Sequence, residues 1–487
     1  MLGAAHLANN MVSPAVKQTW VVMGVLLNMV GQGMVLSFPS ILLPAIQAPD
    51  SDIRADLHVG SWVASCVGIS GIPALLILSF LMDWCGRKKA QIIIMVPGII
   101  GWTLIYLSSN ITTLIIGRVL CGFTGGASLT IGAVIIGEYT SPKNRGMFLN
   151  LKTTAVCFGN MIVHIFGNFL VWKYVALVAL VPHIIAVCII LTWPESPAWL
   201  VSKKRFKSSE KSFYWLRGTS SDSRREIEAL TQAQKEKITF ENSSSISEKM
   251  TGFCKKDFLK PMLVMVFSGL LLEASGRHIF PAYAIQIIRE VTGNTTDSFY
   301  YTLGIDLIIT VSALFSSALV RVLKRRTLLF SSGFAALFIL ACVCIYLYLT
   351  ANGIMSKNRP WIPILLFCGY FILSNLGCTP IPLAFLGELF PLAYRSVGSN
   401  LSGVLLSLYL MIGMQVTPFL LVGVKVYGTF AVFGSATGLA LVVLCFILPE
   451  TKDRTLQEIE DYFNFGEFKN VTDNDEELKI KMIAHQK

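Results

Sequence analysis

The chain has 487 residues, of which 54% are hydrophobic and only 14% are charged. A soluble globular protein carries about 25% charged residues, so this chain has too few to cover an aqueous surface of its size. The composition therefore excludes disordered, collagen-like and disulfide-scaffold chains as well as ordinary soluble enzymes, and leaves a membrane protein.

Seven runs without Asp, Glu, Lys or Arg predict transmembrane helices. Each exceeds the roughly 20 residues that cross the hydrocarbon of a bilayer. In chain order they are 19–49, 61–82, 90–117, 327–356, 361–387, 396–424 and 426–449. Five further spans tolerate an ionisable residue, at about 114–137, 149–171, 174–193, 261–288 and 298–320. We therefore expect an all-α membrane protein with twelve transmembrane helices.

The distribution of Lys and Arg predicts that both termini are cytoplasmic. With that orientation the cytoplasmic side receives 31 of these residues and the outer loops receive six, as the positive-inside rule requires. The net charge of +11 is thus spread over many loops. Because no basic domain stands apart from the membrane, the expected partners are the lipid bilayer and a small solute, and not nucleic acid.

Three polar landmarks occur twice in the same order, at offsets of 238, 250 and 255 residues. The repeat predicts two pseudo-symmetric halves of six helices each. The expected organisation is a cytoplasmic N-terminus (1–19), an N-terminal half (20–200), a cytoplasmic linker with short helices (201–258), a C-terminal half (259–450) and a cytoplasmic tail (451–487).

The landmark residues lie at the inner ends of the spans, where acids and arginines can pair across the two halves. Exposed pairs contribute about 0.2–1 kcal/mol each, so several could bias two conformations without locking either. The alternative is that these charges only set orientation. The predicted cytoplasmic gate consists of Asp83, Gly86, Arg87, Lys88, Glu138, Arg145, Glu195, Arg325, Arg326, Glu388, Arg395 and Glu450.

These motifs resemble those of the sugar porter family of the major facilitator superfamily, which includes facilitative glucose transporters and insect trehalose transporters. The matching segments are Asp83–Lys88, Glu138–Gly146, Pro194–Leu200, Gly387–Arg395 and Pro449–Lys452. The resemblance implies the major facilitator fold, with a solute site near the midplane between two halves that rock against each other. It also implies a uniporter in the plasma membrane that moves a hexose or disaccharide by facilitated diffusion.

Two parts of the chain depart from the family pattern. The acid and glycine of the second loop motif are replaced by Arg321 and Lys324. This change should loosen the inner gate or shift the partners of Arg145 to Glu195, Glu388 or Glu450. The seventh span reads Leu272–His278 where the family has Gln-Gln-Leu-Ser-Gly-Ile-Asn. By alignment with the family, Thr153 stands at a sugar-binding Gln, and Asn375 stands where relatives carry a polar or acidic residue. Both are candidate cavity residues.

Charged residues in the seventh and eighth spans replace the missing amides. At 1.5 Å per residue, Glu273 and Asp306 reach similar depths, and each charge at a bilayer centre costs about 2.5–3.5 kcal/mol. We therefore expect Arg277 to be shared between Glu273 and Asp306 and to line the substrate path with His278 and Tyr283. Gly276 and Pro281 should let the seventh span bend there. The alternative is a structural ion pair near the outer mouth.

Other polar residues of the spans carry weaker predictions. Arg118 matches an arginine that faces an acid on the first span of proton-coupled relatives, but no acid lies between Trp20 and Gln47, which favours facilitated diffusion. Gln32 is a cavity candidate, with hydrogen bonding between helices as the alternative. His164 and His183 are expected to be packed or interfacial and not catalytic.

The leading interpretation is a sugar porter. The alternatives are a carrier of a non-sugar or charged solute, which could be proton-coupled through Glu273 or Asp306, and a non-transporting nutrient sensor. Asn294 begins an outer sequon and is the predicted glycosylation site. No nucleophile–base pair, phosphate loop or Cys/His cluster is visible in the sequence, so we expect no enzyme, cofactor or metal site.

Overall fold

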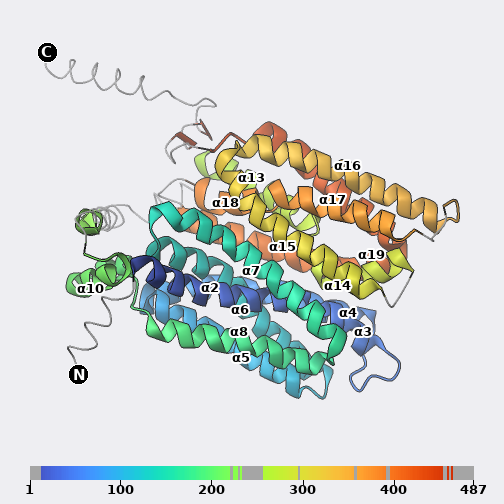
Figure 1. The fold of residues 1–487 in the computed structure, drawn as a ribbon, viewed down its shortest axis with the longest axis horizontal. Coiled ribbons are helices and arrows are strands. Elements are labelled where there is room, and N and C mark those ends of the chain that lie inside the picture. Colours follow the sequence, from blue (N-terminus) through green and yellow to red (C-terminus); the bar gives the residue numbers. More distant parts are fainter. Residues whose placement is uncertain are drawn as a thin grey trace, which may run out of the picture.

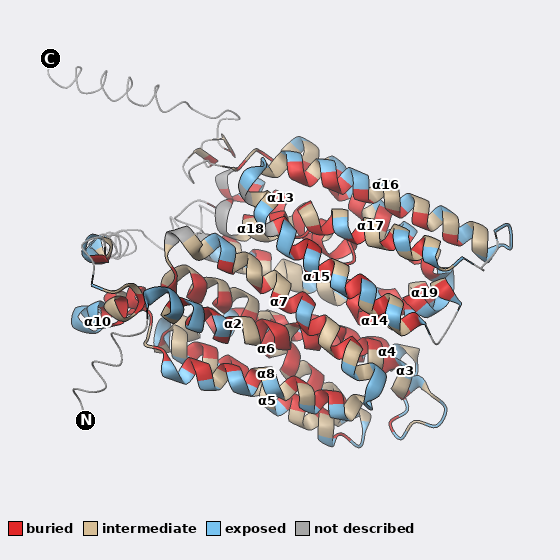
Figure 2. Cartoon of the chain, viewed as in Figure 1, coloured by how far each residue is buried: buried red, intermediate tan, exposed pale blue. Residues whose placement is uncertain are grey.

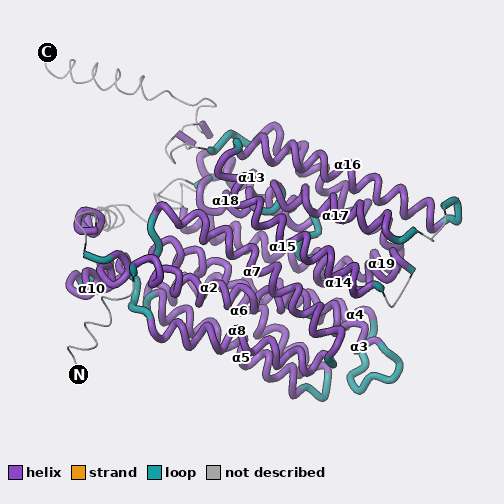
Figure 3. Tube along the Cα trace, viewed as in Figure 1, coloured by secondary structure: helices purple, strands orange, loops and turns teal. Residues whose placement is uncertain are grey.

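The computed structural model describes residues 13–219, 223–228, 231–232, 256–293, 297–355, 359–390, 395–452, 458–459 and 462–463. These residues form helices joined by short loops, and no strand occurs among them (Figure 3). The first group of helices is α2 (Pro14–Ser37), α3 (Pro39–Gln47), α4 (Leu57–Cys85), α5 (Arg87–Leu107), α6 (Ile111–Tyr139), α7 (Pro142–Phe169), α8 (Trp172–Thr192), α9 (Pro197–Ser202) and α10 (Phe206–Arg217). The second group is α13 (Lys256–Ala274), α14 (Ile279–Thr292), α15 (Ser298–Val322), α16 (Arg325–Ala351), α17 (Trp361–Gly377), α18 (Pro380–Glu388) and α19 (Arg395–Ile447).

The long helices form two bundles side by side, α2–α8 in one and α13–α19 in the other (Figure 1). We call these the N half and the C half. They contact each other mainly through α4 with α19 and through α7 with α15. The short helices α9 and α10 lie at one end of the molecule, which we call the linker end; the opposite end is the loop end.

Ten helical stretches of the described chain are long and apolar enough to cross a membrane. One of them, α19, runs for 53 residues but leaves helical geometry at Lys425, which has a φ of 58° and a ψ of −177°. This break divides α19 into two segments, matching the two expected spans at 396–424 and 426–449. The 28-residue α7 is not among the ten, and Lys152 is one of the charged residues along it.

Exposed residues lie along the outward faces of both bundles (Figure 2), and many of the exposed residues of the described chain are large and apolar. Phe80, Phe338 and Phe446 are 68%, 71% and 83% exposed. Soluble monomers rarely expose contiguous apolar surface of this extent, whereas lipid is a favourable environment for it. The burial pattern therefore agrees with the membrane assignment made from composition.

The cores show which end of the molecule is closed. At the loop end a single buried cluster joins both halves, with Met34 and Phe38 from the N half against Phe280 and Tyr283 from the C half. Toward the linker end the buried residues separate into one cluster in the N half and another in the C half. The halves are thus packed together at the loop end and have independent cores at the linker end.

Three of the membrane-crossing stretches are interrupted near their middle. The helices α2 and α3 meet at Phe38, which precedes Pro39. The helices α13 and α14 are separated by residues 275–278, where Gly276 has a φ of +79°. The helices α17 and α18 are separated at Cys378 and Thr379. The bend expected at Gly276 is therefore present, and Tyr370 stabilises it by donating a hydrogen bond of 2.9 Å to the carbonyl of Ser275.

Candidate solute site and gate

At the linker end of the N half, the carboxylate of Glu195 caps the start of α5. Its Oε1 accepts the backbone N–H groups of Arg87 and Lys88, at 2.8 and 3.1 Å. The first N–H groups of a helix have no partner within the helix and carry partial positive charge, so a carboxylate is stabilising there. Gly86 precedes them with a φ of +91°, and a Cβ at this position would lie 2.5 Å from Glu195 Oε2. The loop motif therefore needs glycine at position 86, both to adopt the positive φ and to leave room for the carboxylate of Glu195.

The C half repeats this arrangement. Glu450 accepts the backbone N–H groups of Arg325 and Arg326 at the start of α16, each at 3.1 Å. Basic side chains cap the helix that ends nearby in each half: Lys88 Nζ donates to the carbonyls of Leu191 and Trp193, and Arg326 Nη2 donates to that of Cys445. The sequence repeat is therefore a repeated capping structure.

Another pair of gate residues lies within the N half, whereas Arg145 Nε is buried without a hydrogen-bond partner among the described residues. Arg87 binds Glu138 through Nε and Nη2, at 3.0 and 2.8 Å. In this conformation the described acids and arginines do not pair between the halves as expected. The linker ends of the two halves have separate cores, and the charged side chains cap helices within their own half. The side chains of Glu388 and Arg395, and the sequon residue Asn294, lie outside the described part of the chain.

We predict that Glu195→Gln and Glu450→Gln each lower the melting temperature of the detergent-solubilised protein. Each substitution weakens a carboxylate cap that contributes about 0.3–2 kcal/mol. Because each carboxylate acts within its own half, the two effects should add in the double variant, as distant sites do. Thermal unfolding followed by size-exclusion chromatography measures this. A double variant no less stable than either single variant would instead indicate a gate shared between the halves.

A small polar pocket lies between the halves and has room for about one water molecule in this conformation. Asn150 and Thr153 of α7 line it from one side, and Ser316 of α15 and Asn375 and Thr379 at the α17–α18 break line it from the other. Amide and hydroxyl groups of this kind can both donate and accept hydrogen bonds, as sugar hydroxyls require. The structure brings together the two residues assigned by family alignment, Thr153 and Asn375.

The α13–α14 break holds a chain of three polar side chains. The carboxylate oxygens of Glu273 lie 2.8 and 3.0 Å from His278 Nδ1, and Arg277 Nε donates to His278 Nε2 at 3.1 Å. An arginine can only donate, so His278 Nε2 must be the acceptor and Nδ1 must carry the hydrogen toward Glu273. Arg277 Nη1 is buried and has no hydrogen-bond partner in the described structure.

The expected sharing of Arg277 between Glu273 and Asp306 is wrong. Asp306 instead lies against His164 of α7, with 2.5 Å between Oδ2 and Nδ1. His278 takes the place next to Glu273 because the backbone turn at Gly276 brings residues 273 and 278 together. His164 is buried at the contact between the halves, in agreement with the expectation that it is packed or interfacial. The sequence carried no local signal that would have paired it with a residue 142 positions away.

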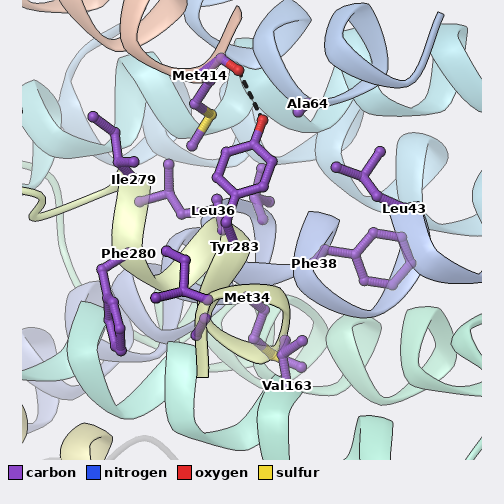
Figure 4. Close-up of a cluster of buried hydrophobic side chains, with 14 of the residues drawn as sticks. Met34, Leu36, Phe38, Leu43, Ala64, Val163, Ile279, Phe280, Tyr283 and Met414 are labelled. Carbon is purple, nitrogen blue, oxygen red and sulfur yellow. Dashed lines mark hydrogen bonds between the residues drawn. The ribbon is translucent and has the colours of Figure 1, made fainter. Parts of the chain in front are cut away.

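Two other candidates are deeply packed in this conformation. Tyr283 is 1% exposed and donates a hydrogen bond of 2.7 Å to the carbonyl of Met414, within the apolar cluster of the loop end (Figure 4). Gln32 packs against Gly125 of α6, where its Oε1 is buried without a hydrogen-bond partner. Neither side chain lines the polar pocket described above.

Arg118 of α6 is fully buried and is held by backbone carbonyls. Its Nη1 donates to Val35 at 2.8 Å and its Nε donates to Val63 at 3.1 Å. The carbonyl of Val35 is available because the residue four positions later, Pro39, has no N–H to offer it. The guanidinium also lies 5.9 Å from the ring centre of Phe38. The helix break at Phe38 therefore supplies one of the two carbonyl partners of Arg118, and α4 supplies the other.

Comparison with known proteins places the chain in a family. The model of the sugar (and other) transporter family matches residues 37–463. The chain belongs to this sugar transporter family. The transporter is 26% identical over 412 residues to the facilitated trehalose transporter Tret1 of Apis mellifera ligustica, covering 84% of this chain and 80% of the relative. It is 27% identical over 401 residues to Tret1 of Polypedilum vanderplanki, covering 82% and 78%.

Solved structures of xylose transporters have the same fold. The proton:xylose symporter XylE bound to 6-bromo-6-deoxy-D-glucose superposes on the transporter with a TM-score of 0.75 at 16% identity, covering 93% of this chain and 100% of that one. The inward-open conformation of XylE from E. coli gives a TM-score of 0.73 at 16% identity, covering 92% and 99%. The major facilitator fold expected from the sequence motifs is thereby confirmed.

Three polar residues of the pocket were missed by sequence reasoning. Asn150, Ser316 and Thr379 line the pocket beside Thr153 and Asn375. Asn150 lies three positions before Thr153, a spacing that puts both on one helical face. This spacing could have pointed to Asn150. Ser316 and Thr379 carry no comparable signal, because Ser and Thr occur throughout these helices.

Proposed function

We propose that the transporter moves a sugar, with trehalose as the first candidate, by facilitated diffusion through alternating access. The polar side chains that both halves bring together around the small pocket carry this proposal. A sugar bound between them touches each half, and rocking of the halves provides the space that it needs and releases it. The relatives of Apis mellifera ligustica and Polypedilum vanderplanki, which are facilitated trehalose transporters, support the choice of solute.

The environment of Arg118 supports facilitated diffusion over proton symport. A proton-coupled pair at this position needs a carboxylate that alternates between the arginine and a proton. Arg118 instead binds the carbonyls of Val35 and Val63, which do not titrate. The proposal of facilitated diffusion therefore rests on hydrogen bonds of Arg118 that do not depend on pH.

We also propose the membrane arrangement that this function requires. Ten apolar stretches, with α19 divided at Lys425 and α7 added, give the twelve spans expected from the sequence. The excess of Lys and Arg at the linker end supports placing that end in the cytoplasm. The loop end then faces outward from the plasma membrane, with Asn294 on that side as the glycosylation candidate.

Uptake of labelled trehalose and glucose by proteoliposomes tests the proposal. We expect saturable uptake that stops at equal concentrations inside and outside, and the same final level when a pH gradient is imposed. Accumulation above the outside concentration under an inward proton gradient would establish symport. Saturable binding without flux of any solute would establish a sensor.

A charged solute is the second candidate, and one observation favours it. Arg277 Nη1 is buried next to the α13–α14 break without a hydrogen-bond partner in the described structure. A guanidinium in this position can bind a carboxylate in a charge-assisted hydrogen bond. Adding labelled glucuronate to the uptake panel decides between the candidates, because flux of glucuronate in preference to glucose would assign Arg277 to an anionic solute.

A further inference from the structure

One side chain of the N half is bonded on both sides by the C half. His164 lies on α7, and its Nδ1 is 2.5 Å from Asp306 Oδ2 on α15. Its Nε2 is 3.0 Å from the carbonyl oxygen of Pro281 in the first turn of α14. The side chains of His164 and Asp306 are 1% and 2% exposed. The junction therefore ties α7 to two helices of the opposite half, away from water.

The geometry fixes the number of hydrogens at this junction. A carbonyl oxygen can only accept, so His164 Nε2 must carry a hydrogen toward Pro281. A second hydrogen must lie between Nδ1 and the carboxylate, either on the imidazolium or on a protonated Asp306. A neutral histidine beside an ionised aspartate has one hydrogen too few, and the two lone pairs would face each other at this distance. The closed junction thus contains one proton more than its separated, neutral-pH components.

This junction lies at the end of the molecule where the halves are packed together. His164 is near the loop end of α7, and the neighbouring contacts of that end are formed by neutral groups. Gln415 of α19 binds Ser61 and Ser65 of α4, at 2.9 and 2.5 Å. Those hydrogen bonds form at any pH, whereas the bond between His164 and Asp306 requires a proton from solution.

We propose that His164 and Asp306 form a proton-binding site that closes the loop end of the transporter. When the loop end opens, the two side chains separate and the proton returns to the solution on that side. When the loop end closes, neutral His164 and ionised Asp306 take up one proton from the same solution. No proton crosses the membrane in this cycle, so the site makes the conformational equilibrium depend on pH while transport remains facilitated diffusion.

Two other ionisable groups face this junction from the helices around it. Cys157 of α7 lies within electrostatic range of both Asp306 and Arg277, and Arg277 comes from the α13–α14 break. Arg277 keeps its charge at every pH used below. The proton of the junction is therefore assigned to the contact between His164 and Asp306, and a Cys157→Ala variant shows whether the thiol contributes.

Labelling of a buried cysteine measures how far the loop end is open. Ser61 is fully buried in the closed loop end, so Ser61→Cys should react with a charged maleimide only after opening. Asn352→Cys, which is exposed at the same end, corrects for the effect of pH on thiol reactivity, and labelling of the parent chain is subtracted. Detergent-solubilised full-length protein is used, so the result does not depend on which solute is carried.

We expect the ratio of the two labelling rates to rise about tenfold per pH unit above pH 7, since closing then requires uptake of one proton. In Asp306→Asn the amide can donate to neutral His164, so the junction closes without that proton and the ratio should stay constant. His164→Gln should also remove the dependence, whereas His58→Gln, which alters another histidine of the loop end, should preserve it.

A ratio that is the same at pH 6 and pH 8.5 in the parent would overturn the proposal. A pH dependence that survives in both Asp306→Asn and His164→Gln would overturn it as well, and one abolished by Cys157→Ala would assign the proton to the thiol. The uptake assay described above is independent of these outcomes, because it measures flux and not proton occupancy.

Discussion

Gly159→Ala is expected to lower the melting temperature of the transporter, and Gly159→Leu to remove its folded population. The helices α2 and α7 approach so closely that a Cβ at Gly159 would overlap the carbonyl oxygen of Val30 and lie 3.1 Å from the Cα of Gly33. Both neighbours are backbone atoms, which cannot move without shifting a helix. Overpacking of this kind costs about 1–3 kcal/mol for small additions and more for larger ones.

Gly304 of α15 provides the matched control for Gly159. It also lies inside a long helix, but a Cβ there would meet no atom within 4 Å. Alanine is the better helix former by up to about 1 kcal/mol, so Gly304→Ala should leave the melting temperature unchanged or raise it. Size-exclusion chromatography of heated, detergent-solubilised protein measures both variants. A Gly159→Ala protein as stable as Gly304→Ala would mean that α2 and α7 are not in backbone contact.

Glu273→Gln is expected to reduce sugar uptake about 10- to 100-fold while the protein still folds. A loss of this size corresponds to a charge-assisted hydrogen bond worth about 1.5–3 kcal/mol. Glutamine can still accept the hydrogen of His278 Nδ1, but the negative charge that balances Arg277 is lost. An uncompensated buried guanidinium then seeks another partner and distorts the break between α13 and α14. Initial rates of trehalose uptake in proteoliposomes, normalised to inserted protein, measure the effect.

The double variant Glu273→Gln with Arg277→Gln separates a role in solute binding from a structural one. If the pair only balances charge, removing both charges should restore uptake to that of the parent. If the side chains contact the solute, uptake should remain low. Glu290→Gln is the control, because Glu290 of α14 accepts the backbone N–H of Val426 at the loop end, away from the polar pocket. Its uptake should stay within about twofold of the parent, since the glutamine side-chain oxygen can still accept the Val426 N–H.

The gate shows where sequence reasoning succeeded and where it stopped. The repeated placement of Glu195 and Glu450 indicated an equivalent role in each half, and both carboxylates cap equivalent helix starts. The sequence could not show whether their partners lie in the same half or across the interface. Arginines and acids at the inner ends of several helices are compatible with either, and the choice depends on how far apart the linker ends stand.

The polar site shows a similar division. Family alignment directed attention to Thr153 and Asn375, and these two residues do line one pocket. The partner of Asp306 could not be predicted, because similar depth in the membrane does not determine which faces of two helices meet. Arg277 and His164 reach comparable levels, and only the rotation of α7 and the turn at Gly276 decide that His164 occupies the position beside Asp306.

The sequence by itself determined that this protein is a helical membrane transporter with two related halves. Hydrophobic run length, the placement of Lys and Arg, and repeated motifs depend on the solvent and on local chain geometry, and these can be evaluated one segment at a time. The tertiary structure decided which end is closed and which charges meet, including the proton-dependent contact of His164 with Asp306. Those contacts depend on the relative rotation and tilt of helices that are far apart in the chain. A sequence with so few charged residues gives little indication of which helix faces meet.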